Sequence, residues 1–250
     1  MKIKSIFSAV LTFLILTSCG TTEPLFKFEN FNYEVNNKKR TLTVNYQYIT
    51  IANASRSKAL QAIEQSLRYE FFQLDGQLTT SLDRTFDMGV AQFRAESGYD
   101  ETNIETGCEL YVDSEVKVID RTLTYTIQGY KYTGGAHGLG WRTGLNYDID
   151  SGKQLTLHDF LSDAQVDALP EILCKQLCYD KGVDADNYFD SLTEIGYYPN
   201  EIQPSENFRL INGGLEFFFY PYEIGVYAVG LTSIIVTFSE LEEVAPNDEE

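Results

Sequence analysis

Two segments near the start of the chain alternate apolar and polar residues, and this pattern most restricts the possible fold. The segments are residues 26–35 and 42–49, separated by the turn-forming residues 36–39. A period of two places the apolar side chains on one face of a β-strand, and two such strands around a short polar turn are typical of a hairpin. We therefore expect a sheet with one apolar face that another layer must cover.

The period then changes to that of a helix. Residues 55–74 and 80–95 carry apolar side chains at steps of three and four, which predicts two helices that pack on the core. Strand patterns follow at 108–119, 123–132, 144–149, 208–211, 214–220 and 226–238, with helices expected after Asp163 and within 184–197. We expect the last strand in the centre of its sheet. Strands in hairpin order with helices in separate blocks predict an α+β fold, in which helices pack on a mostly antiparallel sheet with hairpins at the N- and C-terminal ends.

The first residues have the pattern of an export signal. Lys2 and Lys4 precede an apolar run over 6–16, and Thr17, Ser18 and Cys19 follow it. The run is too short to span a bilayer, and Leu16–Cys19 resembles a bacterial lipobox, whose cysteine receives a diacylglycerol. We expect residues 1–18 to be a lipoprotein signal peptide, residues 19–25 a tether, and the protein to be held by the lipid on Cys19 at a bacterial inner or outer membrane, facing the periplasm or the surface.

The remaining chain has no Pro- or Ser-rich linker. We expect an N-terminal α+β part over 26–150, a C-terminal part over 151–241 packed on it as one unit, and an acidic, frayed tail over 242–250.

Charge limits the possible partners. The chain has 19 basic and 37 acidic residues, a formal net charge of −18, and loss of Lys2 and Lys4 with a leader would make it more negative. Nucleic acid is bound through clustered Lys and Arg, so this balance argues against it. A negative field attracts cationic proteins or peptides, although it can also serve solubility alone.

Metal and cofactor sites have little support. His137 and His158 are the only imidazoles, and no zinc, phosphate-binding or nucleophile-elbow motif is present. For the four-residue spacing of Cys174 and Cys178, two buried thiols or one disulfide are favoured over a zinc site, and the pairing of Cys108 stays open. We expect no metal and no cofactor.

The glycine-rich stretch over 130–141 is the main candidate site. Aromatic residues flank it and His137 lies in it; a second candidate segment, over 220–225, displays Tyr222 and Glu223. Exposed aromatics beside an acid suit sugar stacking or a cationic partner. The structural alternatives are a histidine that orders the turn through backbone hydrogen bonds and a strand bulge at 220–225. The candidate ligand-binding residues are Tyr130, Tyr132, Gly134, Gly135, His137, Gly138, Trp141, Tyr222 and Glu223.

Several motifs resemble one bacterial envelope family. They are Tyr132-Thr-Gly-Gly-Ala-His-Gly138 with residues 143–147, Ser151-Gly-Lys-Gln-Leu-Thr-Leu-His-Asp-Phe160, and Tyr220-Pro-Tyr-Glu-Ile-Gly225 with Ala228-x-Gly230. The family is the domain of unknown function shared by the extracellular part of the anti-sigma factor RsiV and the accessory domain of the peptidoglycan deacetylase PdaC. The resemblance covers about Leu42 to Leu241 and implies an α+β envelope domain that recognises a ligand; in RsiV-like proteins the domain senses lysozyme.

These features together predict a lipid-anchored, non-enzymatic envelope protein. Its ligand would be cell-wall glycan or a cationic wall-lytic protein such as lysozyme. The alternatives are a cell-wall hydrolase that uses His137 as base with a carboxylate such as Glu223, and a structural lipoprotein with no small ligand.

Overall fold

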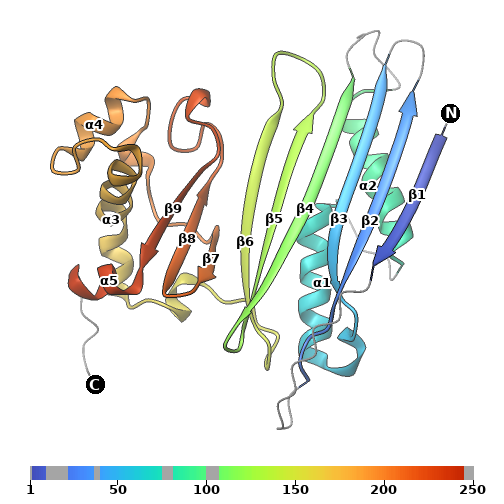
Figure 1. The fold of residues 1–250 in the computed structure, drawn as a ribbon, viewed down its shortest axis with the longest axis horizontal. Coiled ribbons are helices and arrows are strands. Elements are labelled where there is room, and N and C mark those ends of the chain that lie inside the picture. Colours follow the sequence, from blue (N-terminus) through green and yellow to red (C-terminus); the bar gives the residue numbers. More distant parts are fainter. Residues whose placement is uncertain (1, 10–21, 37–39, 75–80, 100–106, 245–250) are drawn as a thin grey trace. The chain divides into compact units, whose positions relative to one another are not determined.

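The computed structural model describes residues 2–9, 22–36, 40–74, 81–99 and 107–244, with the backbone alone for residues 2–9 (Figure 1). The chain forms two compact units. Unit 1 comprises Met1–Val116, Ile127–Gly140 and Ile149–Lys153, and unit 2 comprises Lys117–Thr126, Trp141–Asp148 and Gln154–Glu250. Three strands contribute residues to both units, and the expected parts over 26–150 and 151–241 stay a prediction.

The larger sheet runs in the order β1-β2-β3-β4-β5-β6. Its strands are β1 (Lys2–Ala9), β2 (Phe26–Asn36), β3 (Thr41–Ile51), β4 (Cys108–Ile119), β5 (Thr122–Tyr132) and β6 (Leu139–Asp148). The expected hairpin of β2 and β3 is confirmed, with Phe26 opposite Ile51 in antiparallel register. β3 and β4 are parallel, because the chain between them returns through two helices.

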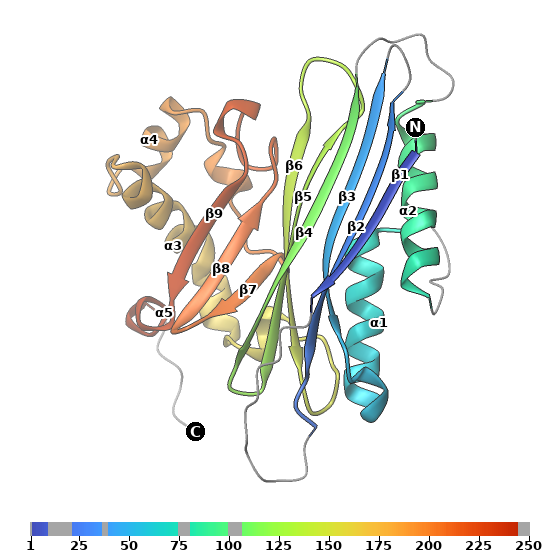
Figure 2. The same cartoon turned by 45° about the vertical axis from the view of Figure 1, so that its right-hand side comes forward.

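Helices α1 (Lys58–Phe72) and α2 (Leu82–Glu96) cover one face of β2–β4 in unit 1 (Figures 1 and 2). Both helices begin at a serine N-cap, Ser57 and Ser81, whose side chain accepts a backbone N–H of the first turn. Strand alternation turns the apolar side chains toward the helices. The resulting core contains Leu42, Val44, Tyr46, Tyr48, Leu60, Ile63, Leu67, Phe71, Phe86, Leu110 and Val112.

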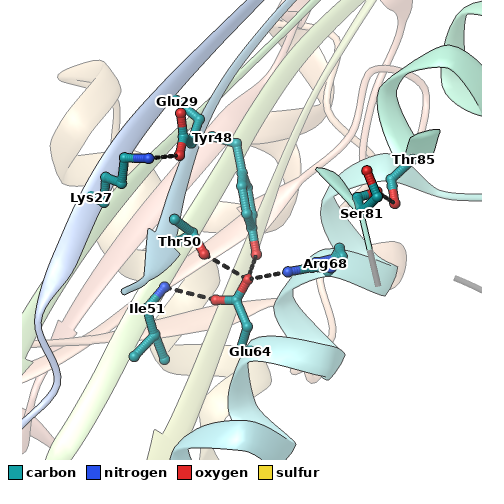
Figure 3. A network of polar contacts seen from close by, with 9 residues as sticks. All are labelled: Lys27, Glu29, Tyr48, Thr50, Ile51, Glu64, Arg68, Ser81 and Thr85. Carbon is teal, nitrogen blue, oxygen red and sulfur yellow. Dashed lines mark hydrogen bonds and ion pairs between the residues drawn. The ribbon is translucent and has the colours of Figure 1, made fainter. Parts of the chain in front are cut away.

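A buried carboxylate joins α1 to β3. Glu64 is only 6 % exposed, and it accepts hydrogen bonds from Tyr48 Oη at 3.0 Å, Thr50 Oγ1 at 2.7 Å and the Ile51 backbone N–H at 2.7 Å. Arg68, one turn further along α1, donates from Nη2 at 3.1 Å (Figure 3). A buried charge is costly unless it is paired and hydrogen-bonded, and here both conditions are met. The network therefore fixes the position of the helix along the strand.

Unit 2 contains a second sheet with the order β7-β8-β9. Its strands are β7 (Phe208–Ile211), β8 (Gly214–Phe219) and β9 (Thr232–Thr237), and its helices are α3 (Asp163–Lys181), α4 (Tyr188–Glu194) and α5 (Phe238–Val244). The α+β class with mostly antiparallel sheets is thus confirmed. A turn at Asn212 and Gly213 joins β7 and β8, and all six residues of β8 are buried.

Four expectations for element positions were wrong. β9 covers only Thr232–Thr237 and lies at the edge of its sheet, because Gly230 has φ 71° and a 3-10 helix occupies Tyr227–Val229 before it. α5 continues from β9 to Val244, where the strand end and a frayed tail were expected. β6 begins at Leu139 rather than 144. Ser162, not Asp163, caps α3, since its side chain accepts the Gln165 N–H.

The three cysteines after Cys19 are free and buried. Burial, and then the neighbouring Cys178, raises the pKa of Cys174 to about 11. The interpretation of Cys174 and Cys178 as two buried thiols is confirmed.

The expected leader is described only in part. Its residues Lys2–Ala9 form β1, antiparallel to β2. Residues 10–21, with Cys19, lie outside the described residues, so cleavage and lipidation stay predictions.

Candidate functional site

The glycine loop, residues 133–138, connects β5 to β6 within unit 1. Gly134 and Gly135 have φ of 98° and 109°, a backbone conformation that side chains with a Cβ rarely adopt. Tyr132 Oη donates to the Gly135 carbonyl at 2.9 Å, and the Tyr130 ring lies where a Cβ of Gly138 would be. Two tyrosines and three glycines therefore define the shape of this loop.

His137 is exposed at the tip of the glycine loop. Its Nδ1 lies 3.2 Å from the carbonyl oxygen of Gly138, a distance at which an Nδ1–H donates to that oxygen. The imidazole thus contacts the backbone of its own loop and remains accessible to solvent. This geometry agrees with a residue that orders the turn, and it leaves a ligand contact open.

The tyrosine loop, residues 220–230, is the second candidate and belongs to unit 2. Tyr222 is 57 % exposed and has φ 73°, which is rare for a residue other than glycine. The centroids of the Tyr222 and Tyr227 rings are 5.3 Å apart, and the angle between the two ring planes is 35°. Glu223 Oε2 accepts the Tyr220 backbone N–H at 2.6 Å, which closes the turn beneath Tyr222. Strained backbone held by its surroundings is frequent at ligand sites.

A neighbouring segment holds the tyrosine loop in place. The backbone N–H of Tyr198 donates to Ile224 O at 2.8 Å, and that of Val226 donates to Gly196 O at 2.9 Å. A Cβ on Gly225 would lie 2.8 Å from Gly196 O, so this close approach requires glycine. Tyr198 and Val226, which take part in this pairing, and Ile195 next to Gly196 have exposed side chains. An exposed apolar group of this kind marks a candidate binding surface.

Two asparagine side chains connect β6 to β7 and β8 inside unit 2. Asn207 Oδ1 accepts the Gly144 N–H, and its Nδ2 donates to the carbonyls of Arg142 and Phe218, all at 3.0 Å. Asn146 Nδ2 donates to Phe208 O at 3.0 Å, and its Oδ1 accepts the Leu210 N–H at 2.8 Å. The two side-chain amides thus make the hydrogen bonds that backbone groups would otherwise make between β6 and the small sheet.

This connection brings β6 to the tyrosine loop. Thr143 Oγ1 lies 3.1 Å from Tyr220 Oη, and Trp141 points to the same side of β6 as Thr143 by strand alternation. The Trp141 indole Nε1 is buried without a hydrogen-bond partner among the described residues. An indole N–H in that state is available as a donor to a ligand.

The structure therefore divides the predicted site residues between the units. Tyr130, Tyr132, Gly134, Gly135, His137 and Gly138 belong to unit 1, and Trp141, Tyr222 and Glu223 belong to unit 2. Glu223, the carboxylate of the hydrolase alternative, is engaged in its own turn. Within the described part of the chain, no group of three or more His, Cys, Asp or Glu side chains is arranged to hold a metal ion.

Sequence reasoning missed Tyr198 and Tyr227 as members of the site. Tyr198 reaches the tyrosine loop through pairing between segments more than twenty residues apart, whereas Tyr227 belongs to the 3-10 helix within the loop itself. Tyr198 directly before Pro199 was a usable signal, since a proline marks a turn in which a neighbouring residue is displayed.

Residues 158–239 match the family model described as "Protein of unknown function (DUF3298)". The segment is thus similar to the DUF3298 domain. It contains α3, α4, the small sheet and the tyrosine loop. The resemblance predicted from the sequence is confirmed, and the domain supplies Tyr222 and Glu223, whereas Trp141 and the glycine loop precede it.

The chain is 27 % identical over 214 residues to the peptidoglycan-N-acetylmuramic acid deacetylase PdaC of Bacillus subtilis (strain 168). The alignment covers 84 % of this chain and 44 % of PdaC, so the chain spans less than half the length of that relative.

Two solved structures of DUF3298 family proteins share the fold. The protein from Bacteroides fragilis NCTC 9343 has a TM-score of 0.73 at 24 % identity, with 90 % of this chain and 94 % of that chain covered. The protein from Pseudomonas aeruginosa PAO1 has a TM-score of 0.63 at 19 % identity, with 89 % and 94 % covered.

None of the helices in the described part of the chain combines the length and apolar character that crossing a bilayer requires.

Proposed function

We propose that this protein binds cell-wall glycan at the envelope without catalysing a reaction, and that the tyrosine loop is its recognition surface. The observation that carries the proposal is the exposed Tyr222, paired with the partly buried Tyr227, on a backbone fixed by Glu223 and by residues 196–198. Tyrosine rings offer an apolar face for a sugar ring and a hydroxyl for its polar edge.

Trp141 lies on the side of β6 where Thr143 meets Tyr220. Its Nε1 is buried without a hydrogen-bond partner among the described residues, so this N–H is not displayed to solvent. A rigid surface loses little conformational entropy on binding, which favours recognition by a few aromatic contacts.

The similarity to PdaC supports an association with the cell wall, since PdaC acts on peptidoglycan according to its name. The match covers less than half of PdaC, so its deacetylase activity does not carry over with the aligned part. We propose binding as the property that the two proteins share.

A sedimentation assay with purified insoluble peptidoglycan tests the proposal. The protein is expected to sediment with the wall material, and Tyr222→Ala is expected to weaken binding about tenfold through loss of stacking. Tyr179→Ala is the matched control, because Tyr179 is 66 % exposed in the same unit and lies on α3. Wild-type protein that stays in the supernatant, or equal losses for the two variants, would contradict the proposal.

The charge of the chain favours a second candidate, a cationic wall-lytic protein such as lysozyme. The formal net charge of −18 attracts a basic protein over a long range. Such binding should weaken steeply between low and physiological salt, whereas stacking on a glycan should change little. Titration with lysozyme at two salt concentrations separates the candidates.

We also propose that Cys19 carries the lipid that anchors the protein to a membrane. The apolar run over 6–16 followed by Thr17, Ser18 and Cys19 supports this. Cys19→Ser should move the protein from the membrane fraction to the soluble fraction; unchanged fractionation would contradict the anchor.

A further inference from the structure

The face of unit 1 opposite α1 and α2 has an ordered array of polar side chains. Register between the strands defines three rows across β2, β3 and β4, and we call this array the open face. Its rows are Glu34–Thr43–Glu109, Asn32–Asn45–Tyr111 and Asn30–Gln47–Asp113. Neighbouring strands lie about 4.8 Å apart, so the side chains of each row are adjacent.

The open face is accessible to solvent. Along β3 the buried residues Leu42, Val44 and Tyr46 alternate with the partly or fully exposed Thr43, Asn45 and Gln47. Along β4 the exposed positions are Glu109, Tyr111 and Asp113. Tyr111 is 42 % exposed, although it lies in the middle of the array.

The amides of the open face are already ordered. Asn45 Nδ2 donates to Asn32 Oδ1, and Asn32 Nδ2 donates to Asn30 Oδ1 at 2.8 Å. These hydrogen bonds fix the orientation of the three asparagine amides, and thereby the directions in which their remaining N–H and C=O groups point. Ordered amides on a flat surface suit the hydroxyl groups of a polymer that lies across the strands.

The row next to Tyr111 on the open face contains two carboxylates, Glu109 and Glu34. Glu109 precedes Tyr111 by two residues on β4, and Glu34 lies one row away on β2. Partial burial, and then the negative charges of Glu109 and Glu34, raises the pKa of the Tyr111 hydroxyl. None of the nine residues of the open face is basic. A positively charged group therefore has the most favourable interaction energy with this face, through the Tyr111 ring and the carboxylates.

We propose that the open face binds a glycan whose amino sugars carry free amino groups. The amide chain accepts and donates hydrogen bonds to sugar hydroxyls, the Tyr111 ring contacts a sugar face, and Glu34 or Glu109 pairs with the ammonium group. An N-acetylated sugar has no charge to offer the carboxylates and would leave them partly desolvated, so it binds more weakly.

This surface is separate from the tyrosine loop, and the inference does not depend on the proposed function. The open face belongs entirely to unit 1, and the tyrosine loop belongs to unit 2. A variant in one surface therefore tests that surface alone.

Calorimetric titration of the full chain with two soluble oligomers tests the inference. The glucosamine hexamer should bind at least about tenfold more tightly than the N-acetylglucosamine hexamer. Tyr111→Ala should weaken binding of the glucosamine hexamer about tenfold, and Tyr111→Phe should retain most of it, because the ring face is preserved. Glu109→Gln should reduce the preference between the two hexamers.

The control variant is Tyr69→Ala, which removes a 53 % exposed tyrosine from α1 in the same unit. It should leave hexamer binding unchanged. Circular dichroism of Tyr111→Phe confirms that the sheet is intact. No binding of the glucosamine hexamer, equal binding of the two hexamers, or insensitivity to Tyr111→Ala would overturn the inference. Equally tight, Tyr111-dependent binding of a lysine hexapeptide would also overturn it, since the face would then recognise cationic peptides in general.

Discussion

Replacement of Glu64 should destabilise unit 1 in a graded way. Oε1 of Glu64 accepts from Tyr48, Thr50 and Arg68, and Oε2 accepts the Ile51 N–H. Glu64→Gln keeps the shape but replaces one acceptor by an NH₂ group. In one amide orientation this group faces the Ile51 N–H, and in the other it faces Arg68, so a donor meets a donor either way.

The expected cost follows from the burial of these groups. A hydrogen bond to a charged group contributes about 1.5–3 kcal/mol, and Arg68 is partly exposed and can turn to water. Glu64→Gln should therefore lower the free energy of unfolding by about 2–3 kcal/mol. Glu64→Leu removes both acceptors and leaves the buried Ile51 N–H and the two hydroxyls unpaired, so its cost should exceed about 4 kcal/mol.

Urea unfolding followed by circular dichroism measures both values as shifts of the midpoint at unchanged slope. Gln65→Ala is the control, since Gln65 is exposed on α1 beside Glu64, and its effect should stay within about 0.5 kcal/mol. A cost below about 1 kcal/mol for Glu64→Gln, or a Leu variant as stable as the Gln variant, would refute the assigned role of the network.

Three further predictions concern other parts of the chain. Gly144→Ala should lower the free energy of unfolding of unit 2 by about 2 kcal/mol or more in a urea titration, because the added Cβ would overlap the Phe208 carbonyl. The control Gly140→Ala on the same strand places a Cβ at an ordinary 3.6 Å from Gly129 O, so it should cost far less. For Glu96, burial tends to raise the pKa, but hydrogen bonds from Gln92 and Lys131 lower it below its usual value. Lys131→Met should therefore raise the pKa of Glu96 in an NMR titration. The variant should be slightly less stable than the wild type at pH 7, and this difference should disappear below the folded pKa, where the carboxyl is protonated in the folded and the unfolded protein. An unchanged pKa of Glu96 would be inconsistent with the ion pair. The Cys174 thiol, with a pKa of about 11, should react with a maleimide at pH 8 only after unfolding. The free energy of unfolding should fall as the pH rises above the ordinary thiol pKa, because there the thiol ionises in the unfolded protein but not in the folded one. Fast labelling of the folded protein would argue against the burial of Cys174.

Local patterns in the sequence predicted the elements whose side chains alternate or repeat regularly. β2, β3 and α1 follow from such patterns, because one face of each is apolar and the other polar. The start of β9 did not follow, since residues 226–238 are mostly apolar and the positive φ of Gly230 is not visible in composition. The central position of β8 could have been inferred from the unbroken run Leu215–Phe219, which contains one charged residue.

The candidate sites were predictable to a lesser degree. Tyr222 could be expected at the surface, because Pro221 and Gly225 interrupt the strand pattern around it. Its ring partner Tyr227 lies in the same loop, but the position of Tyr198 depends on contact with a distant segment. The open face required the register of three strands, one of them parallel, and alternation alone cannot supply a register between strands that are far apart in the sequence.

Each unit consists of three separate segments of the chain, and this limits which fragments of the protein can fold. The segment that matches DUF3298, residues 158–239, lacks Arg142, Gly144 and Asn146, whose groups bond to Asn207 and β7. Expressed alone, it would leave the Asn207 amide and one side of β7 without these partners. A fragment that ends at residue 150 would likewise carry pieces of strands whose neighbours are missing. Folding must wait until the last strands have been synthesised, so the whole chain, and not the domain recognised by sequence, is the smallest unit that export and refolding experiments should use.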